Sequence, residues 1–229
     1  MQRHFVQELE ALKTNLIRMG SLAEQAVHDS IRAMIERDAE LASGVIAKEG
    51  RINAFELEND DAVVDLLALQ QPVASDLRFI LSGLKINNDL ERIGDHAVNI
   101  AESAISYADR PKLTIELALP RMGEIAETML REAIDGFIHA NPALARGVLR
   151  NDDIIDDLNR QTVGELVHVI RTDPEAVEQA LDLVRVSRNL ERIADLATNI
   201  AEEVIYVTEA HVVKHHLEEK AGPPSGRDR

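Results

Sequence analysis

The sequence predicts an all-α protein built from two tandem, pseudo-symmetric three-helix bundles, each running up, down and up. Its composition favours long helices, because 45% of residues are apolar, only 3% are aromatic and tryptophan is absent. Apolar residues recur with the period of an amphipathic helix over runs of roughly 25 to 35 residues. The second half also repeats the first, and 229 residues suffice for two domains of about a hundred residues each.

The repeat is clearest in two segments that lie one hundred residues apart. LERIGDHAVNIAE occupies residues 90–102, LERIADLATNIAE occupies residues 190–202, and the two agree at ten of thirteen positions. A second pair of segments, 19–34 and 122–137, shares Met-Gly, Ala-Glu, an acidic residue and an isoleucine at matching places. An internal repeat of this kind defines the architecture, so the two halves should be copies of one unit.

Each half of the chain is expected to fold as one three-helix unit. The first unit covers residues 1–110, the second covers 111–210, and residues 211–229 form a flexible C-terminal tail. Breakers and periodic runs predict six helices, at 3–37, 39–70, 73–108, 114–140, 142–171 and 174–209. A helix of 30 residues spans about 45 Å, so each unit should be an elongated bundle.

Polar residues and prolines mark where these helices begin. Asp38 precedes the second helix as an N-cap, and Asn141-Pro142 opens the fifth with proline in its first turn. Gln71-Pro72 and Asp173-Pro174 are expected to open the third and sixth helices in the same way. Pro120 lies inside the fourth predicted helix, which therefore begins there or kinks.

The third helix of each unit is predicted to lie at the centre of the molecule. One side of helix 73–108 carries apolar residues that we expect in the core, namely Leu90, Ile93, Ala97 and Ile100. The opposite side is apolar near its start, and the same holds in helix 174–209; these residues are Leu77, Leu81, Leu84, Val177, Leu181 and Val184. We therefore expect the two helices to pack against each other through these residues, with Glu91 and Asp95 at the interface edge. Gly20 and Gly123 recur within helices and indicate close helix packing.

The charge balance narrows the range of partners. Twenty-five basic and 41 acidic residues give a formal net charge of −16. This disfavours nucleic acid and anionic membrane surfaces and favours cations or basic patches on proteins. Cysteine is absent, which fits a reducing cytoplasm. We see neither a long apolar run nor a signal-peptide pattern, so the sequence predicts a soluble, cytoplasmic protein.

Acidic residues recur at helical spacing on neighbouring helices. Glu91 and Asp95 are four residues apart, and the second helix carries a stripe of Glu49, Asn53, Glu56 and Asp60. The second unit repeats both features, with Glu191 and Asp195 on its third helix and Asp152, Asp156 and Asn159 on its second. Such pairs on adjacent helices supply hard oxygen ligands suited to Fe, Mn, Mg, Ca or Zn. Because charge runs on helices are common, the spacing by itself favours a solvated acidic stripe, relieved by Arg92 and Arg192, over a metal site.

Other candidate groups are weaker. Glu165-x-x-His168 is a lone ExxH, whereas a ferritin-like di-iron centre needs two such motifs and two further glutamates. His28 and His96 lie beside acids and could join a site, although each is more often a polar surface residue. Tail histidines (His211, His215 and His216) could bind metal adventitiously. Neither a Gly-rich phosphate loop nor a nucleophilic triad is visible.

The combination of motifs resembles the PhoU family. The resemblance rests on the tandem units, on ERIGD (91–95) and ERIAD (191–195), and on QPVASDLR (71–78), and it extends over residues 5–208. It implies two three-helix bundles side by side and multinuclear iron or zinc clusters held by paired E(D)xxxD motifs. The residues that match these motifs are Glu91, Asp95, Glu191, Asp195, Asp152 and Asp156, with Glu49 and Asn53 at the equivalent place on the second helix. The amide of Asn53 lowers the ligand charge of that cluster.

The resemblance also implies a function. PhoU-like proteins are negative regulators of phosphate uptake and of the phosphate-starvation response. They act as cytoplasmic adaptors between the phosphate ABC transporter, through its ATPase subunit, and the sensor histidine kinase of the phosphate two-component system. We therefore expect no enzymatic activity, no nucleic-acid partner, membrane association only through partners, and a possible homodimer. A carboxylate-bridged di-metal enzyme and a metal-free helical scaffold are the alternatives.

Overall fold

The computed structural model describes residues 2–72 and 74–210, and within them it confirms the predicted all-α fold of two three-helix bundles. The helices are α1 (Gln2–Glu36), α2 (Ala39–Gln70), α3 (Ala74–Ala108), α4 (Leu119–Ile138), α5 (Pro142–Thr172) and α6 (Val177–Glu209), with a short 3₁₀ helix η1 (Pro174–Ala176) before α6. The predicted tail, 211–229, lies outside the described residues. None of the described helices is long and apolar enough to cross a membrane.

Capping bonds confirm the predicted N-caps of α2 and α5, Asp38 and Asn141. The Asp38 carboxylate accepts from the backbone N–H groups of Glu40 and Leu41, at 3.0 and 2.9 Å. Asn141 accepts from Ala143 at the start of α5. Asp173 caps η1, which leads directly into α6. These side chains satisfy backbone donors that have no partner within the helix.

One predicted capping role and one predicted helix start were wrong. Gln71 does not open α3; it ends α2, with left-handed backbone angles (φ 46°, ψ 58°) that suit a helix C-terminus. The fourth helix begins at Leu119 rather than at residue 114, which agrees with the alternative of a start at Pro120, now in the first turn. Proline lacks a backbone N–H and is therefore tolerated in a first turn, where that donor would have no helical partner.

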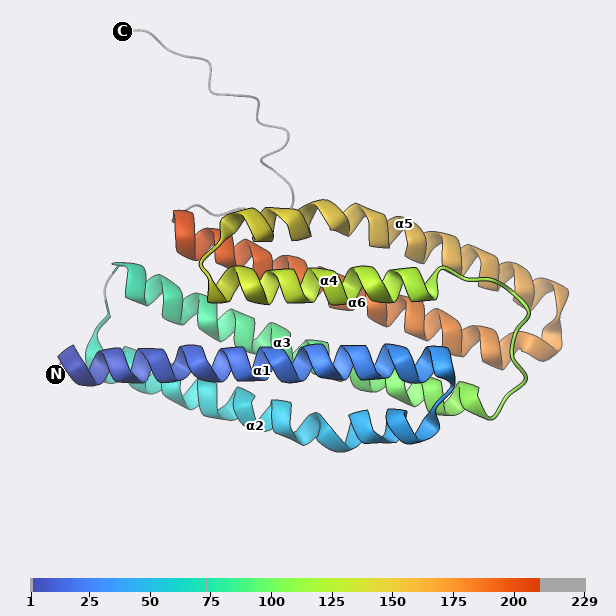
Figure 1. The fold of residues 1–229 in the computed structure, drawn as a ribbon, viewed down its shortest axis with the longest axis horizontal. Coiled ribbons are helices and arrows are strands. Elements are labelled where there is room, and N and C mark those ends of the chain that lie inside the picture. Colours follow the sequence, from blue (N-terminus) through green and yellow to red (C-terminus); the bar gives the residue numbers. More distant parts are fainter. Residues whose placement is uncertain (1, 73, 211–229) are drawn as a thin grey trace, which may run out of the picture.

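The two units meet along two pairs of antiparallel helices. The contact between α3 and α6 is the most extensive in the described structure, and α1 and α4 form a second seam over it. Figure 1 shows α1 and α4 alongside each other, with α2 and α5 at opposite edges of the molecule. Each edge helix contacts the other helices of its own unit. The predicted central position of α3 and α6 is thus confirmed.

The prediction of which residues form the α3–α6 interface was partly wrong. Leu81 and Leu181 remain 40% and 55% exposed. Polar bonds cross the interface instead: Ser82 donates to Glu203 at 2.6 Å, and His96 Nδ1 lies 2.8 Å from Asn189 Oδ1. Because Ser82 and His96 are fourteen residues apart, they share a helix face, which is not the face of Leu81. Glu91 and Asp95 accordingly lie toward the α2–α3 seam and not at the α3–α6 edge.

Glycines allow the second seam to close. A Cβ on Gly20 would lie 3.1 Å from Ile134 Cδ1, and one on Gly123 would lie 2.8 Å from Ile31 Cγ2. Each glycine of one unit therefore faces an isoleucine of the other. The prediction that Gly20 and Gly123 mark close helix packing is confirmed, and the packing joins the two halves. The predicted core residues of α3 (Leu90, Ile93, Ala97 and Ile100) are all buried.

Candidate metal centre

Three predicted carboxylates converge in the second unit. Asp156 of α5 and Glu191 and Asp195 of α6 each offer one oxygen, and these oxygens all lie within 4.8 Å of one another. The two α6 residues are one turn apart, so both face α5. Nearby, Ser187 of α6 donates to Asn159 of α5 at 2.7 Å, which holds the two helices together beside the group. All three carboxylates are half-buried.

Two carboxylates of this group, those of Asp156 and Glu191, have raised pKa values. Burial is the largest cause of the raised pKa of Asp156, and the charge of Asp195 adds to it. Burial and then Asp195 likewise raise the pKa of Glu191. Arg192 offsets part of this repulsion, since its Nη1 lies 2.8 Å from Asp195 Oδ2 and its Nε lies 3.6 Å from Glu191 Oε2. A bound cation would relieve the remaining repulsion.

The fourth residue predicted for this site, Asp152, is not a member of the three-carboxylate group. It lies one turn before Asp156 on α5 and is half-buried. The structure therefore brings together three of the four residues predicted for the second unit.

The first unit has a looser arrangement of the same kind. Burial raises the pKa of Glu91, and Asp95, Glu56 and Glu49 raise it further, which places these acids around it. Asn53 Oδ1 is buried and accepts no hydrogen bond from any described residue. Among the described residues, these carboxylates do not reach the mutual 4.8 Å spacing seen in the second unit.

Both arrangements have the donor chemistry of a hard-cation site. Carboxylate oxygens dominate in each, and the buried carbonyl oxygen of Asn53 is a neutral oxygen donor whose missing partner a cation could replace. Glu56 belongs to the first arrangement, although the motif match had left it out. The helical stripe from Glu49 through Asn53 to Glu56 was the sequence signal that identified it.

The predicted histidine candidates lie away from the carboxylate group. His28 Nδ1 is 3.3 Å from Glu127 Oε2 across the seam of α1 and α4, and His96 contacts Asn189. Glu165 accepts a hydrogen bond from Gln161 at 2.8 Å, and His168 is exposed. The tail histidines (His211, His215 and His216) lie outside the described residues.

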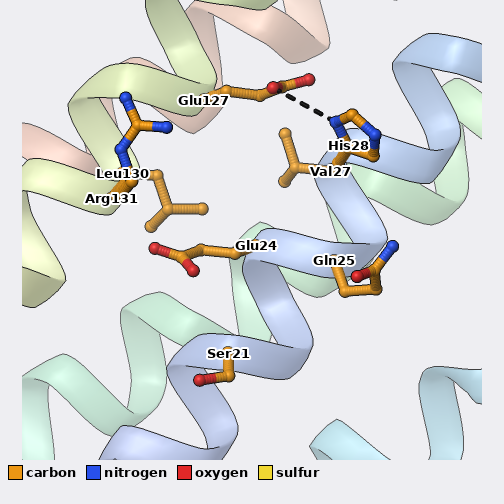
Figure 2. Close-up of a pocket in the computed structure, with 8 residues that line it drawn as sticks. All are labelled: Ser21, Glu24, Gln25, Val27, His28, Glu127, Leu130 and Arg131. Carbon is orange, nitrogen blue, oxygen red and sulfur yellow. Dashed lines mark hydrogen bonds and ion pairs between the residues drawn. The ribbon is translucent and has the colours of Figure 1, made fainter.

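A separate, open hollow of about 200 Å³ lies at the seam of α1 and α4. Figure 2 shows its lining residues: Ser21, Glu24, Gln25, Val27, His28, Glu127, Leu130 and Arg131. In the repeat, Glu24 of the first unit corresponds to Glu127 of the second, and His28 corresponds to Arg131. Burial raises the pKa of Glu24, Asp135 raises it further, and Arg131 opposes both effects. Each carboxylate thus lies near a basic group of the other unit, so the hollow links the two units.

Fold and site together define a class: a tandem-repeat helical protein with an acidic group between the second and third helices of each repeat. The sequence model of the PhoU domain matches the chain twice, at residues 16–104 and 119–204. The chain belongs to the PhoU family.

Known proteins resemble the chain over most of its length. It is 39% identical to the phosphate-specific transport system accessory protein PhoU homolog of Aquifex aeolicus, over 93% of this chain and 97% of that protein. The crystal structure of PhoU from Pseudomonas aeruginosa superposes with a TM-score of 0.88 at 37% identity, covering 90% of this chain and all of that one. The phosphate transport system regulatory protein PhoU from Streptococcus pneumoniae gives 0.85 at 27% identity, covering 92% of this chain and all of that one.

Proposed function

We propose that this protein is a cytoplasmic negative regulator of phosphate uptake and of the phosphate-starvation response. The observation that carries the proposal is the match to the PhoU domain in both units, together with 39% identity to a phosphate-specific transport accessory protein along nearly the whole of both chains. The protein acts as an adaptor rather than as an enzyme. It links the ATPase subunit of the phosphate ABC transporter to the sensor histidine kinase of the phosphate two-component system.

An adaptor role agrees with the surface that the fold provides. Long helices present extended faces on both units, and the net charge of −16 favours basic patches on partner proteins. The protein reaches the membrane through these partners, and a homodimer would double the number of docking faces. The two units, divided near residue 110, would then serve as two related docking modules.

Iron or zinc clusters are part of the proposal. Asp156, Glu191 and Asp195 would hold one cluster, and Glu91, Asp95, Glu49, Glu56 and Asn53 would hold the other. Support comes from the converging oxygens of the second unit and from the unpartnered buried oxygen of Asn53 in the first. The cations would tie α2 to α3 and α5 to α6, and so stiffen the faces offered to partners.

Deleting the gene tests the regulatory role. A phosphate-starvation reporter should be expressed in high phosphate in the deletion strain, and the wild-type gene in trans should restore repression. A reporter that stays repressed in the deletion strain in high phosphate would rule out the adaptor function.

Elemental analysis of the purified protein tests the metal clusters separately. Wild type should bind iron or zinc, and the Glu191→Gln/Asp195→Asn variant should lose more of it than the Glu91→Gln/Asp95→Asn variant, because the second group converges more closely. Equal metal content in wild type and a variant with all four substitutions would mean that the acids are only a docking surface.

A further inference from the structure

A basic hollow lies beside the carboxylate group of the second unit. Its volume is about 430 Å³, and it is lined by Asn159, Arg160 and Val163 of α5 and by Arg188, Glu191 and Arg192 of α6. Three guanidinium groups and a single carboxylate thus line one surface hollow, in a protein whose net charge is −16. A net positive hollow on so acidic a protein is a candidate anion site.

The arginines of the hollow differ in how they are engaged. Arg192 is bonded to Asp195, and Arg160 is paired with Asp157 on its own helix. Arg188 makes neither a hydrogen bond nor an ion pair within 4 Å with any residue that the structure describes, although its charge lowers the pKa of Glu191. Arg188 therefore keeps all five N–H donors for a ligand.

The hollow also has a fixed polar wall. Asn159 Oδ1 accepts the hydrogen bond from Ser187, which orients the amide. Its Nδ2 donates to none of the described residues and is therefore a further available donor. Val163 supplies an apolar part of the lining, one helical turn from Asn159.

The first unit lacks this arrangement, although the repeat provides every corresponding position. Arg160 corresponds to Leu57, Arg188 to Asn88 and Val163 to Asp60. Glu56 corresponds to Asn159, and Glu91 to Glu191. Of the six corresponding positions in the first unit, only Arg92 is basic. The six positions carry a formal charge of +2 in the second unit and −2 in the first. The basic hollow is thus a feature of one unit, not a consequence of the shared fold.

We propose that Arg160, Arg188, Arg192 and Asn159 form a binding site for a small tetrahedral oxyanion of the phosphate type. Guanidinium groups present paired N–H donors that match the oxygens of a phosphoryl group. The hollow falls within the roughly 300 to 1,000 Å³ range of small-molecule sites. The site does not depend on the proposed regulatory function. Free phosphate and the phosphoryl group of a phosphomonoester share this chemistry.

Calorimetric titration at low ionic strength tests the site. One arm titrates inorganic phosphate and the other O-phosphoserine into chelator-treated protein, using wild type and the Arg160→Gln/Arg188→Gln variant. The control is Arg150→Gln/Arg171→Gln, which removes the same charge from exposed positions of α5 outside the hollow. All four arginines are exposed, so the core is untouched in both variants.

The expected result is saturable binding by wild type that weakens at least about tenfold in the Arg160→Gln/Arg188→Gln variant, because two charged donors to the oxyanion are lost. The control should retain wild-type affinity, and the tighter arm identifies the source of the phosphoryl group. An absence of saturable binding in both arms, or equal weakening in the two variants, overturns the proposal.

Discussion

The two units share one fold and a nearly identical third-helix motif, yet their acidic groups differ. In the second unit three carboxylate oxygens lie within 4.8 Å of one another. In the first, the acids surround Glu91 more loosely, and Asn53 takes the position that Asp156 holds in the second unit. Because Glu91, Asp95, Glu191 and Asp195 repeat faithfully, the difference arises from the partner helices, α2 and α5.

The repeated motif supplies only half of each site. The ERIxD segment fixes two carboxylates on one face of α3 or α6, and the facing helix determines whether they meet a third acid, an amide or an arginine. The same holds for the basic hollow, where three of the four differing residues, Asn159, Arg160 and Val163, belong to α5.

The largest expected effect comes from making the first unit resemble the second. Asn53→Asp places a buried charge among Glu49, Glu56 and Glu91, so we expect the free energy of unfolding in chelator to fall by about 1 to 3 kcal/mol. Added zinc should restore stability, because the new carboxylate completes a ligand set. Thermal unfolding with and without zinc measures both effects.

The reciprocal and control variants sharpen this test. Asp156→Asn removes one charge from the second group and should stabilise the metal-free protein, whereas Asn88→Asp adds a charge at an exposed position and should change little. If Asn53→Asp were as stable as wild type in chelator, the acids of the first unit would be too far apart or too well solvated to interact.

A smaller effect is expected at the glycines of the seam. Gly123→Ala brings a methyl group to 2.8 Å from Ile31 Cγ2, and the β-branched isoleucine has little freedom to move aside. We expect a loss of about 1 to 2 kcal/mol in the free energy of unfolding, measured by urea denaturation. Gly20→Ala, with 3.1 Å available, should cost less.

Gly44 provides the matched control, since a Cβ there meets nothing within 4 Å. Gly44→Ala should be neutral or stabilising by up to about 1 kcal/mol, through helix propensity alone. If the Gly123→Ala and Gly44→Ala proteins were equally stable, α1 and α4 would accommodate the added methyl group without a loss in the free energy of unfolding.

The smallest expected effect concerns a buried difference between α3 and α6, where Asp89 of the first unit corresponds to Asn189 of the second. Burial raises the pKa of Asp89 from 3.8 to about 6, while Arg92 opposes the shift. The protonated form is therefore favoured in the folded state, and its stabilisation, complete below pH 3.8, is lost as the pH rises through about 6.

Asp89→Asn should accordingly raise the free energy of unfolding at pH 8 by about 1 kcal/mol, since one pKa unit corresponds to about 1.4 kcal/mol and the ion pair with Arg92 is lost. The advantage should shrink as the pH falls from about 6 to 4. Urea denaturation at several pH values measures it, with Asp61→Asn at an exposed position as the control. A pH-independent difference between Asp89→Asn and wild type would contradict the assignment.

Local chemistry explains which helix boundaries could be predicted. Asp38 and Asn141 have short side chains whose oxygens reach the N–H groups of the next helical turn, so both starts were predicted correctly. Gln71 lies between two helices and was assigned to the wrong one, because the sequence does not state which backbone conformation it adopts. The late start of α4 follows from Pro120, whose position allowed either a kink or a start.

The sequence by itself determined the six helices, their duplication, the central position of α3 and α6, and the acids that could serve as ligands. These follow from periodicity and repetition, which are local properties of the chain. Only the tertiary structure decided that Leu81 stays exposed while Ser82 and His96 cross the interface. It also decided that Asp156 joins Glu191 and Asp195 while Asp152 does not. The physical reason is that helix rotation is set by packing against several neighbours at once, and a single helix's pattern does not record it.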